Sequence, residues 1–185
     1  MHHWERLLQT DRSAMDYQRA NFFIESPNFH ARTAGNPRFI VIHTTGGNDI
    51  SGAINEFLRP GNGHDRGKSA HYIVDRNGQI YQMVRENSAA GHCANLNSRH
   101  NLLSIGIEHV ASVHSEITLV QSMASMDLVR YLSRKHGIPL RHDPTPFAPG
   151  IRGHGEQFIS STHNCPNPQW NWDEYIRLAN LSPAI

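Results

Sequence analysis

The stretch Phe39-Ile40-Val41-Ile42 constrains the fold of this 185-residue chain more than any other. A run of β-branched and aromatic residues of this kind is typical of a strand that is buried on both faces. The run leads directly into His43-Thr44-Thr45-Gly46-Gly47. The sequence therefore predicts a sheet-centred domain in which His43 emerges at the carboxyl end of a buried strand.

Turn and helix signals predict the other elements. The predicted strands are a hairpin of 71–74 and 79–84 about Asn77-Gly78, a strand at 104–110 and a short strand at 151–153. The predicted helices run from Asp49 or Ser51 to Leu58, from Thr118 to Gly137, and over 172–181 with Asn171 or Asp173 at its start. The helix that begins at Thr118 is expected to bury the face formed by Leu119, Met123, Met126, Val129 and Leu132. This order predicts an α/β fold with one central mixed β-sheet flanked by helices. We expect residues 1–36 to be an N-terminal segment with a short helix, and residues 37–185 to be the catalytic domain.

Composition excludes several classes of partner. Lys and Arg number 17 against 16 acidic residues, so no basic field favours nucleic acid or an anionic membrane. The first thirty residues contain no apolar run long enough for the core of a signal peptide. No later run approaches the length of a membrane span, about 18 residues. The two cysteines, Cys93 and Cys165, could form a single structural disulfide or remain free thiols. We expect a protein that binds neither nucleic acid nor membrane.

Histidine is overrepresented, with 14 residues, and imidazole is both a common metal ligand and a proton carrier near neutral pH. A catalytic zinc takes three protein ligands from His, Cys and carboxylate side chains and keeps a fourth position open. His43, His154 and Cys165 could form such a set. Spacing alone does not establish the site, because each of them taken singly fits a surface or core histidine, or an inert thiol, better than a ligand.

Four segments together resemble a known family. They are "FIVIHTTGG", "SAHYIVDRNGQIYQMV", "GHCANLNSRHNLLSIGIEHV" and "GHGEQFISSTHNCPNP". In this order they are similar to the zinc amidases of the amidase_2 type, whose fold is shared by N-acetylmuramoyl-L-alanine amidases, T7-type phage lysozymes and peptidoglycan recognition proteins. The resemblance implies one zinc ion held by His43, His154 and Cys165, at the carboxyl ends of strands, and peptidoglycan or a muropeptide as substrate.

The resemblance also implies a proton carrier for hydrolysis. In the bacterial amidase branch this group is the glutamate of "SIGIE", which is Glu108 here. The T7-like branch uses a tyrosine at a position that Ala70 occupies in this chain, and Tyr72 lies on the opposite face of its strand. Glu108 is therefore the predicted catalytic acid and base, and a solvated strand carboxylate is its alternative.

Further site residues are predicted from their position near these motifs. His163 stands two residues before Cys165, where relatives carry a lysine or threonine that stabilises the oxyanion. It is predicted as a catalytic oxyanion donor, with a role as an additional metal ligand as the alternative. The predicted substrate contacts are His92, Arg66, Lys68 and Asn95.

The expected reaction is cleavage of the amide between N-acetylmuramic acid and L-alanine of the stem peptide. Two alternatives stay open: a zinc endopeptidase that cuts elsewhere in the stem peptide, and a peptidoglycan-binding module without catalysis. We expect a monomer that is cytoplasmic until it is released to the cell wall, as a phage endolysin is. A cytoplasmic enzyme of muropeptide recycling and a toxin delivered between cells are the other settings.

Overall fold

The computed structural model describes residues 12–61, 67–93, 98–112, 114–157 and 164–181. Its elements, in chain order, are the 3₁₀-helix η2 (Arg12–Ala14), β1 (Phe22–Phe23), β2 (Phe29–Ala31), β3 (Phe39–Thr44), α1 (Ile50–Leu58), β4 (Tyr72–Val74), β5 (Ile80–Gln82), β6 (Ser88–Ala90), α2 (Arg99–Leu102), β7 (Ser104–His109), α3 (Leu119–His136), β8 (Gly150–Gly153), the 3₁₀-helix η3 (His154–Gln157) and α4 (Trp172–Leu181). None of the helices in these ranges has the length and apolar character needed to cross a membrane.

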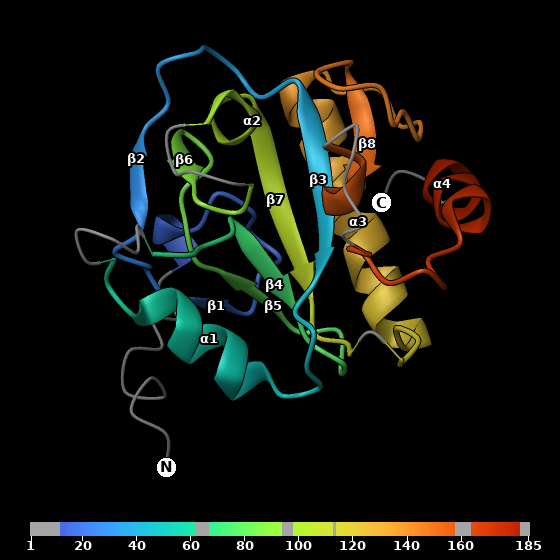
Figure 1. Ribbon diagram of the computed structural model, residues 1–185, viewed down its shortest axis with the longest axis horizontal. Helices are drawn as coiled ribbons and strands as arrows, with labels where there is room; N and C mark the ends of the chain where they lie inside the picture. Colours follow the sequence, from blue (N-terminus) through green and yellow to red (C-terminus); the bar gives the residue numbers. More distant parts are fainter. Residues whose placement is uncertain (1–11, 62–66, 94–97, 113, 158–163, 182–185) are drawn as a thin grey trace.

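The central sheet is mixed, with strand order β1-β5-β4-β7-β3-β8 (Figure 1). Strand β3 lies between β7 and β8 and is parallel to both, whereas β4 and β5 form the predicted antiparallel hairpin. A separate two-stranded sheet joins β2 to β6. The predicted α/β class, with one central mixed sheet flanked by helices, is confirmed.

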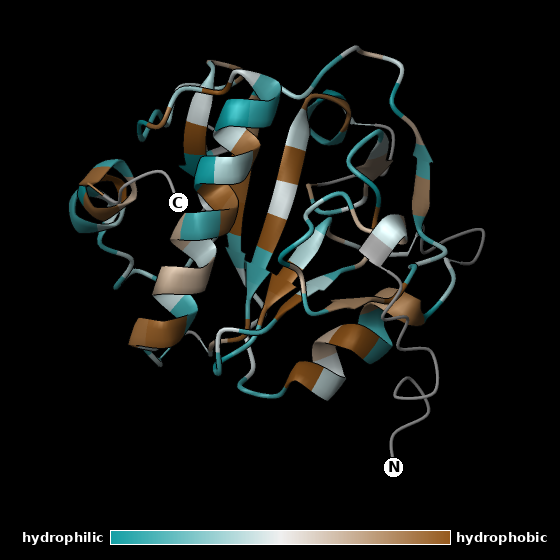
Figure 2. Cartoon of the chain, turned by 180° about the vertical axis from the view of Figure 1, so that it is seen from behind, coloured by the Kyte–Doolittle hydropathy of each residue, from teal (hydrophilic) through white to brown (hydrophobic). Residues whose placement is uncertain are grey.

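Helices cover both faces of this sheet, as Figures 1 and 2 show from opposite sides. On one face, α3 and α4 pack over Ile40, Ile42, Ile105 and Ile107. On the other face, α1 packs its buried Ile54 and Phe57 against a second apolar cluster. Burial on both faces explains the uninterrupted apolar run of β3, in which residues 39–43 are all buried.

Several predicted boundaries are confirmed by their capping contacts. Asp49 caps α1, Thr118 forms a capping box with Gln121 at the start of α3, and Gly137 ends α3 with a left-handed φ of 68°. The Asn171 carboxamide accepts the Glu174 backbone N–H and so caps α4. Local chemistry alone fixes these helix ends.

The predicted buried face of α3 is wrong in its first two turns. Leu119 and Met123 are 73% and 55% exposed, while Gln121 and Ser125 are buried. Gln121 is inward because its side-chain amide donates to the carbonyls of Val74 and Val110, which a leucine could not satisfy. Figure 2 shows the exposed apolar start of α3 in brown.

The N-terminal segment contributes directly to the folded core. Strand β1 extends the main sheet beside β5, and Tyr17 and Phe23 are buried in the cluster under α3. Strands β1, β2 and β6 were not predicted, because strands of two or three residues carry too little periodic pattern to recognise.

Arg32 ties this segment to the rest of the domain. Its guanidinium donates to the carbonyls of Leu102 at 2.6 Å, Ser88 at 2.7 Å and Ser104 at 3.0 Å. These carbonyls belong to β6, α2 and β7, so one side chain joins three elements that lie far from residue 32 in the chain.

We expect Arg32→Met to lower the free energy of unfolding by about 3 kcal/mol, because it leaves several carbonyls without their charged donor. Urea denaturation measures this change. The exposed Arg38, changed to Met, is the control and should alter stability far less. An equal loss of unfolding free energy in the two variants would show that the hydrogen bonds of Arg32 do not stabilise the fold.

Candidate active site

The candidate site lies where three neighbouring parallel strands end. In the β3–β7 register His43 is paired with Glu108, and in the β3–β8 register Ile42 is paired with Gly153, directly before His154. Paired residues of adjacent strands project from the same face of a sheet. The sheet therefore brings His43, Glu108 and His154 side by side although they are far apart in sequence.

Cys165 completes a possible metal site. The donor atoms of His43, His154 and Cys165 all lie within 4.8 Å of one another. The Cys165 Sγ is 3.9 Å from His43 Nδ1, and the two histidine rings have centroids 4.5 Å apart. The structure thus brings together the three predicted ligands from a strand, a strand end and a loop.

Backbone contacts hold the Cys165 loop against the sheet. The Thr44 amide donates to the Cys165 sulfur at 3.4 Å, and the Gly155 amide donates to the Cys165 carbonyl at 2.5 Å. A side chain at position 153 would meet Pro166 Cδ at 2.5 Å, so glycine there permits the close approach. The cysteine is held from both sides.

Glu108 is directed into the site and is not a solvated strand carboxylate. Its side chain is 13% exposed, and its Oε1 lies 3.9 Å from His43 Nδ1. Within the described residues, Oε2 is buried without a hydrogen-bond partner. Burial raises the pKa of Glu108 to about 8, a shift that Lys68 partly offsets. Such a carboxyl group, poised near neutral pH beside a candidate metal site, suits proton transfer.

The residues present fit a zinc ion. Two imidazoles and one thiol are the donor types that zinc prefers, and an incomplete tetrahedral shell leaves room for a water molecule or substrate. Burial raises the pKa of the Cys165 thiol to about 12, so the thiolate needs a positive charge beside it. A divalent cation among these three donors would supply that charge.

The site opens into a cavity of about 730 Å³. His43, Glu108, His154 and Cys165 line it together with residues of the β3–α1 loop, of α1 and of the 68–69 segment. The Lys68 ammonium lies at its edge, 3.3 Å from the carboxylate of Glu56. The volume suits a ligand of peptide or sugar size, and Lys68 is placed to meet an anionic group on such a ligand.

His92 also lines this cavity, yet it is only 8% exposed. Its Nδ1 lies 3.0 Å from His43 Nε2 and 3.2 Å from the Cys93 sulfur, and its Nε2 lies 3.1 Å from the Ser104 hydroxyl. Burial lowers the pKa of His92 well below its usual value, so the ring is neutral. Both ring nitrogens of His92 therefore have hydrogen-bonding partners within the protein.

Both cysteines are free, so the single disulfide considered from the sequence does not form in this structure. Cys93 is fully buried beside His92, and burial raises the pKa of its thiol well above the usual value. His43, His92 and Cys93 form the other group in the described part of the chain that could hold a metal.

Three predicted site residues, His163, Arg66 and Asn95, lie outside the described residues. Glu156 was not predicted from the sequence. Its carboxylate accepts the Gly153 amide at 2.6 Å and contacts His142 at 2.9 Å. These contacts hold the turn from β8 into η3, on which His154 stands. A single glutamate in a 3₁₀-helix of four residues carries no pattern that would have revealed this role.

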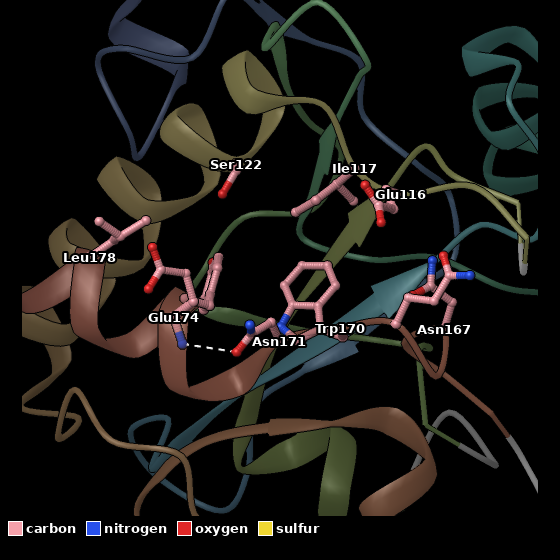
Figure 3. Close-up of a pocket in the computed structure, with 10 residues that line it drawn as sticks. Glu116, Ile117, Ser122, Asn167, Trp170, Asn171, Glu174 and Leu178 are labelled. Carbon is pink, nitrogen blue, oxygen red and sulfur yellow. Dashed lines mark hydrogen bonds between the residues drawn. The ribbon is translucent and has the colours of Figure 1, made fainter.

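A second, smaller pocket of about 310 Å³ lies between α3, α4 and the loop before α4 (Figure 3). Trp170, Glu116 and Glu174 line it, and Asn171 caps α4 at its edge. Both possible metal groups among the described residues include His43, and none of their members lines this second pocket. The set of His43, His154 and Cys165 therefore faces the larger cavity and not this pocket.

The sequence profile of the Amidase_2 family, described as N-acetylmuramoyl-L-alanine amidase, matches residues 33–168. This range covers most of the chain and includes His43, Glu108, His154 and Cys165. The chain belongs to this amidase family. The family and the enzyme class that the four segments predicted are confirmed, and peptidoglycan is the substrate class of the family.

Individual relatives agree with this assignment. The chain is 28% identical over 181 residues to N-acetylmuramoyl-L-alanine amidase A of Achromobacter lyticus, covering 90% of this chain and 97% of that protein. A selenomethionine AmpD derivative matches with a TM-score of 0.67 at 21% identity, over 92% of this chain and 98% of that one. The amidase LysC of Clostridium intestinale URNW matches with a TM-score of 0.60 at 21% identity, over 80% and 87%. The two structures confirm the amidase fold.

We expect Gly153→Ala to weaken zinc binding roughly tenfold or more, because the new methyl group displaces Pro166 and with it Cys165. Competition with a chromophoric chelator measures the dissociation constant. Gly47→Ala is the control, since a methyl group at position 47 of the same cavity meets no atom within 4 Å. Unchanged zinc affinity in Gly153→Ala would argue against Cys165 as a ligand.

Proposed function

We propose that this amidase uses one zinc ion, held by His43, His154 and Cys165, to hydrolyse the amide between N-acetylmuramic acid and the L-alanine of the stem peptide. The observation that carries the proposal is the position of Glu108. A buried carboxyl group with an unpaired oxygen lies 3.9 Å from the first of three convergent ligand side chains, in a cavity of about 730 Å³.

The chemistry divides between the metal and the chain. A zinc ion at these ligands supplies Lewis acidity, which acidifies water and polarises the amide carbonyl. Glu108 accepts the proton of the attacking water at its unpaired Oε2 and later delivers it to the leaving nitrogen of L-alanine. The three ligands fix where the amide carbonyl must lie relative to Glu108.

Other side chains have supporting roles in this proposal. His163, two residues before Cys165, donates a hydrogen bond to the oxyanion. Lys68, at the cavity edge, receives a carboxylate of the stem peptide. Arg66 and Asn95 are proposed as further substrate contacts. The enzyme acts as a monomer.

The proposed biological setting is release to the cell wall in the manner of a phage endolysin. Structurally similar proteins include the endolysin amidase LysCS of Clostridium intestinale URNW and the Ph2119 endolysin from a Thermus scotoductus bacteriophage. The near-neutral composition, with a formal net charge of +1, offers no strong electrostatic attraction to an anionic wall. Recognition therefore depends on the cavity itself.

We expect Glu108→Gln to retain one zinc per chain and to lose about 10²- to 10⁴-fold in turnover, because the carboxamide cannot accept the proton. Cys165→Ser should lose zinc and activity together, since a hydroxyl is a much poorer zinc ligand than a thiolate. Elemental analysis gives the zinc content. Mass spectrometry of digested sacculi gives the released peptides, which should begin with L-alanine.

Glu116→Gln is the matched control, because Glu116 is an exposed carboxylate in the second pocket, away from the ligands. It should keep both zinc and activity. Peptides with a different new amino terminus would identify an endopeptidase instead. Zinc-loaded protein that binds sacculi without releasing any peptide would contradict the hydrolytic role.

A further inference from the structure

We propose that His92 is a positioning residue that selects the tautomer and ring orientation of His43, so that His43 presents Nδ1 to the metal. The groups involved, here named the His92 relay, are His43 Nε2, His92, the Ser104 hydroxyl and the His100 carbonyl. This inference rests on the zinc site of the proposed function, but it concerns residues that do not ligate the metal.

The direction of the relay is fixed at its far end. A carbonyl oxygen only accepts, so the Ser104 hydroxyl donates to the His100 carbonyl at 2.6 Å. Ser104 Oγ must then accept at its 3.1 Å contact, which places the proton of the neutral His92 ring on Nε2. His92 Nδ1 is consequently an acceptor, and His43 Nε2 donates to it across 3.0 Å.

The consequence falls on the opposite side of the His43 ring. With its proton on Nε2, His43 keeps a lone pair on Nδ1, the atom that lies 3.9 Å from both Cys165 Sγ and Glu108 Oε1. A hydrogen bond on the remote nitrogen selects the tautomer of a ligating imidazole and holds its ring in orientation. The Ser104 hydroxyl and the His100 carbonyl thus determine, through His92, which ring nitrogen of His43 carries the proton.

The packing leaves His92 little freedom to leave this position. A Cβ atom at position 106 would lie 2.5 Å from the His92 ring, so Gly106 in β7 provides the space that the ring occupies. The His92 ring meets the His43 ring edge-on at 5.1 Å. The backbone amides of His92 and Cys93 both donate to the buried Asn101 carboxamide at 3.2 and 2.8 Å. The loop that carries His92 is therefore anchored independently of the metal.

The same atoms allow one competing interpretation, a metal ion held by His43, His92 and Cys93. That interpretation requires His92 Nδ1 and His43 Nε2 both to be unprotonated and turned toward a common ion. The relay instead gives each nitrogen a partner at hydrogen-bonding distance and keeps the Cys93 thiol protonated beside them. The relay predicts one zinc ion per chain. A metal ion held by His43, His92 and Cys93, here named the inner metal group, would be a second.

The test compares two substitutions at one position in the zinc-loaded protein. His92→Leu removes the acceptor, and we expect it to weaken zinc binding 10- to 100-fold in a chelator competition, as losses of such outer partners do. His92→Asn retains a carbonyl oxygen near the place of Nδ1 and should recover most of the affinity. His71→Leu is the control: His71 is also fully buried and its ring meets the His92 ring edge-on at 5.8 Å, but its side-chain hydrogen bonds are to Gly106, Ser88 and Arg32, none of which is a proposed ligand. It should lower the melting temperature without a comparable change in zinc affinity.

A spectroscopic measurement reads the relay without relying on affinity or activity. Long-range ¹H–¹⁵N correlation spectra of the zinc-loaded protein should show His43 and His92 each protonated at Nε2. Zinc bound through Nε2 of His43, or a proton on Nδ1 of His92, would overturn the relay. A second zinc that disappears in Cys93→Ala would overturn it in favour of the inner metal group.

The possible failures are distinguishable. If the wild-type protein binds one zinc and releases L-alanyl peptides, but His92→Leu and His92→Asn bind zinc as the wild type does, the relay fails and the proposed function stands. If the wild-type protein binds no zinc, both fail. A loss of affinity in His71→Leu as large as in His92→Leu would reduce the role of His92 to general packing and overturn the proposal.

Discussion

The parallel hydrogen-bond ladder of β7, β3 and β8 is the constraint on which the rest of this site depends. Its register aligns Glu108 with His43 and brings His154 to the same edge, so three separate parts of the chain present their polar side chains together. A shift of one residue would turn each side chain to the opposite face of the sheet. The two apolar layers under α1 and α3 hold that register, because any slip would expose them.

Burial sets the electrostatics of the site. Because Glu108 and Cys165 are largely removed from water, their pKa values are raised to about 8 and about 12, and each charged form needs a partner. A cation between the ligands would stabilise the Cys165 thiolate. The Glu108 carboxyl group would then remain able to accept and release a proton. The same burial keeps His92 neutral, which lets a serine and a carbonyl decide where its proton lies. Desolvation thus favours a cation beside Cys165 and keeps the neighbouring His92 ring neutral.

Much of this arrangement could be predicted from sequence, for reasons particular to each element. The buried run of β3 and the caps at Asp49, Thr118 and Gly137 are local signals and gave the correct elements. The candidate ligands and Glu108 came from resemblance and not from spacing. The start of α3 was misassigned because Gln121 is buried for its hydrogen bonds, which periodicity of apolar residues does not register. The role of Arg32 depends on distant partners, and the short strands and the single residues Glu156 and Ser104 carry no local pattern.

Zinc K-edge X-ray absorption of the purified, zinc-loaded protein tests the central claim most directly. One sulfur at about 2.3 Å and two imidazole nitrogens at about 2.0–2.1 Å would match a centre of His43, His154 and Cys165 with a further light atom in the open position. The spectrum of Cys165→Ser should lack the sulfur. A wild-type centre without sulfur, or a sulfur signal that persists in Cys165→Ser and vanishes in Cys93→Ala, would contradict this ligand set.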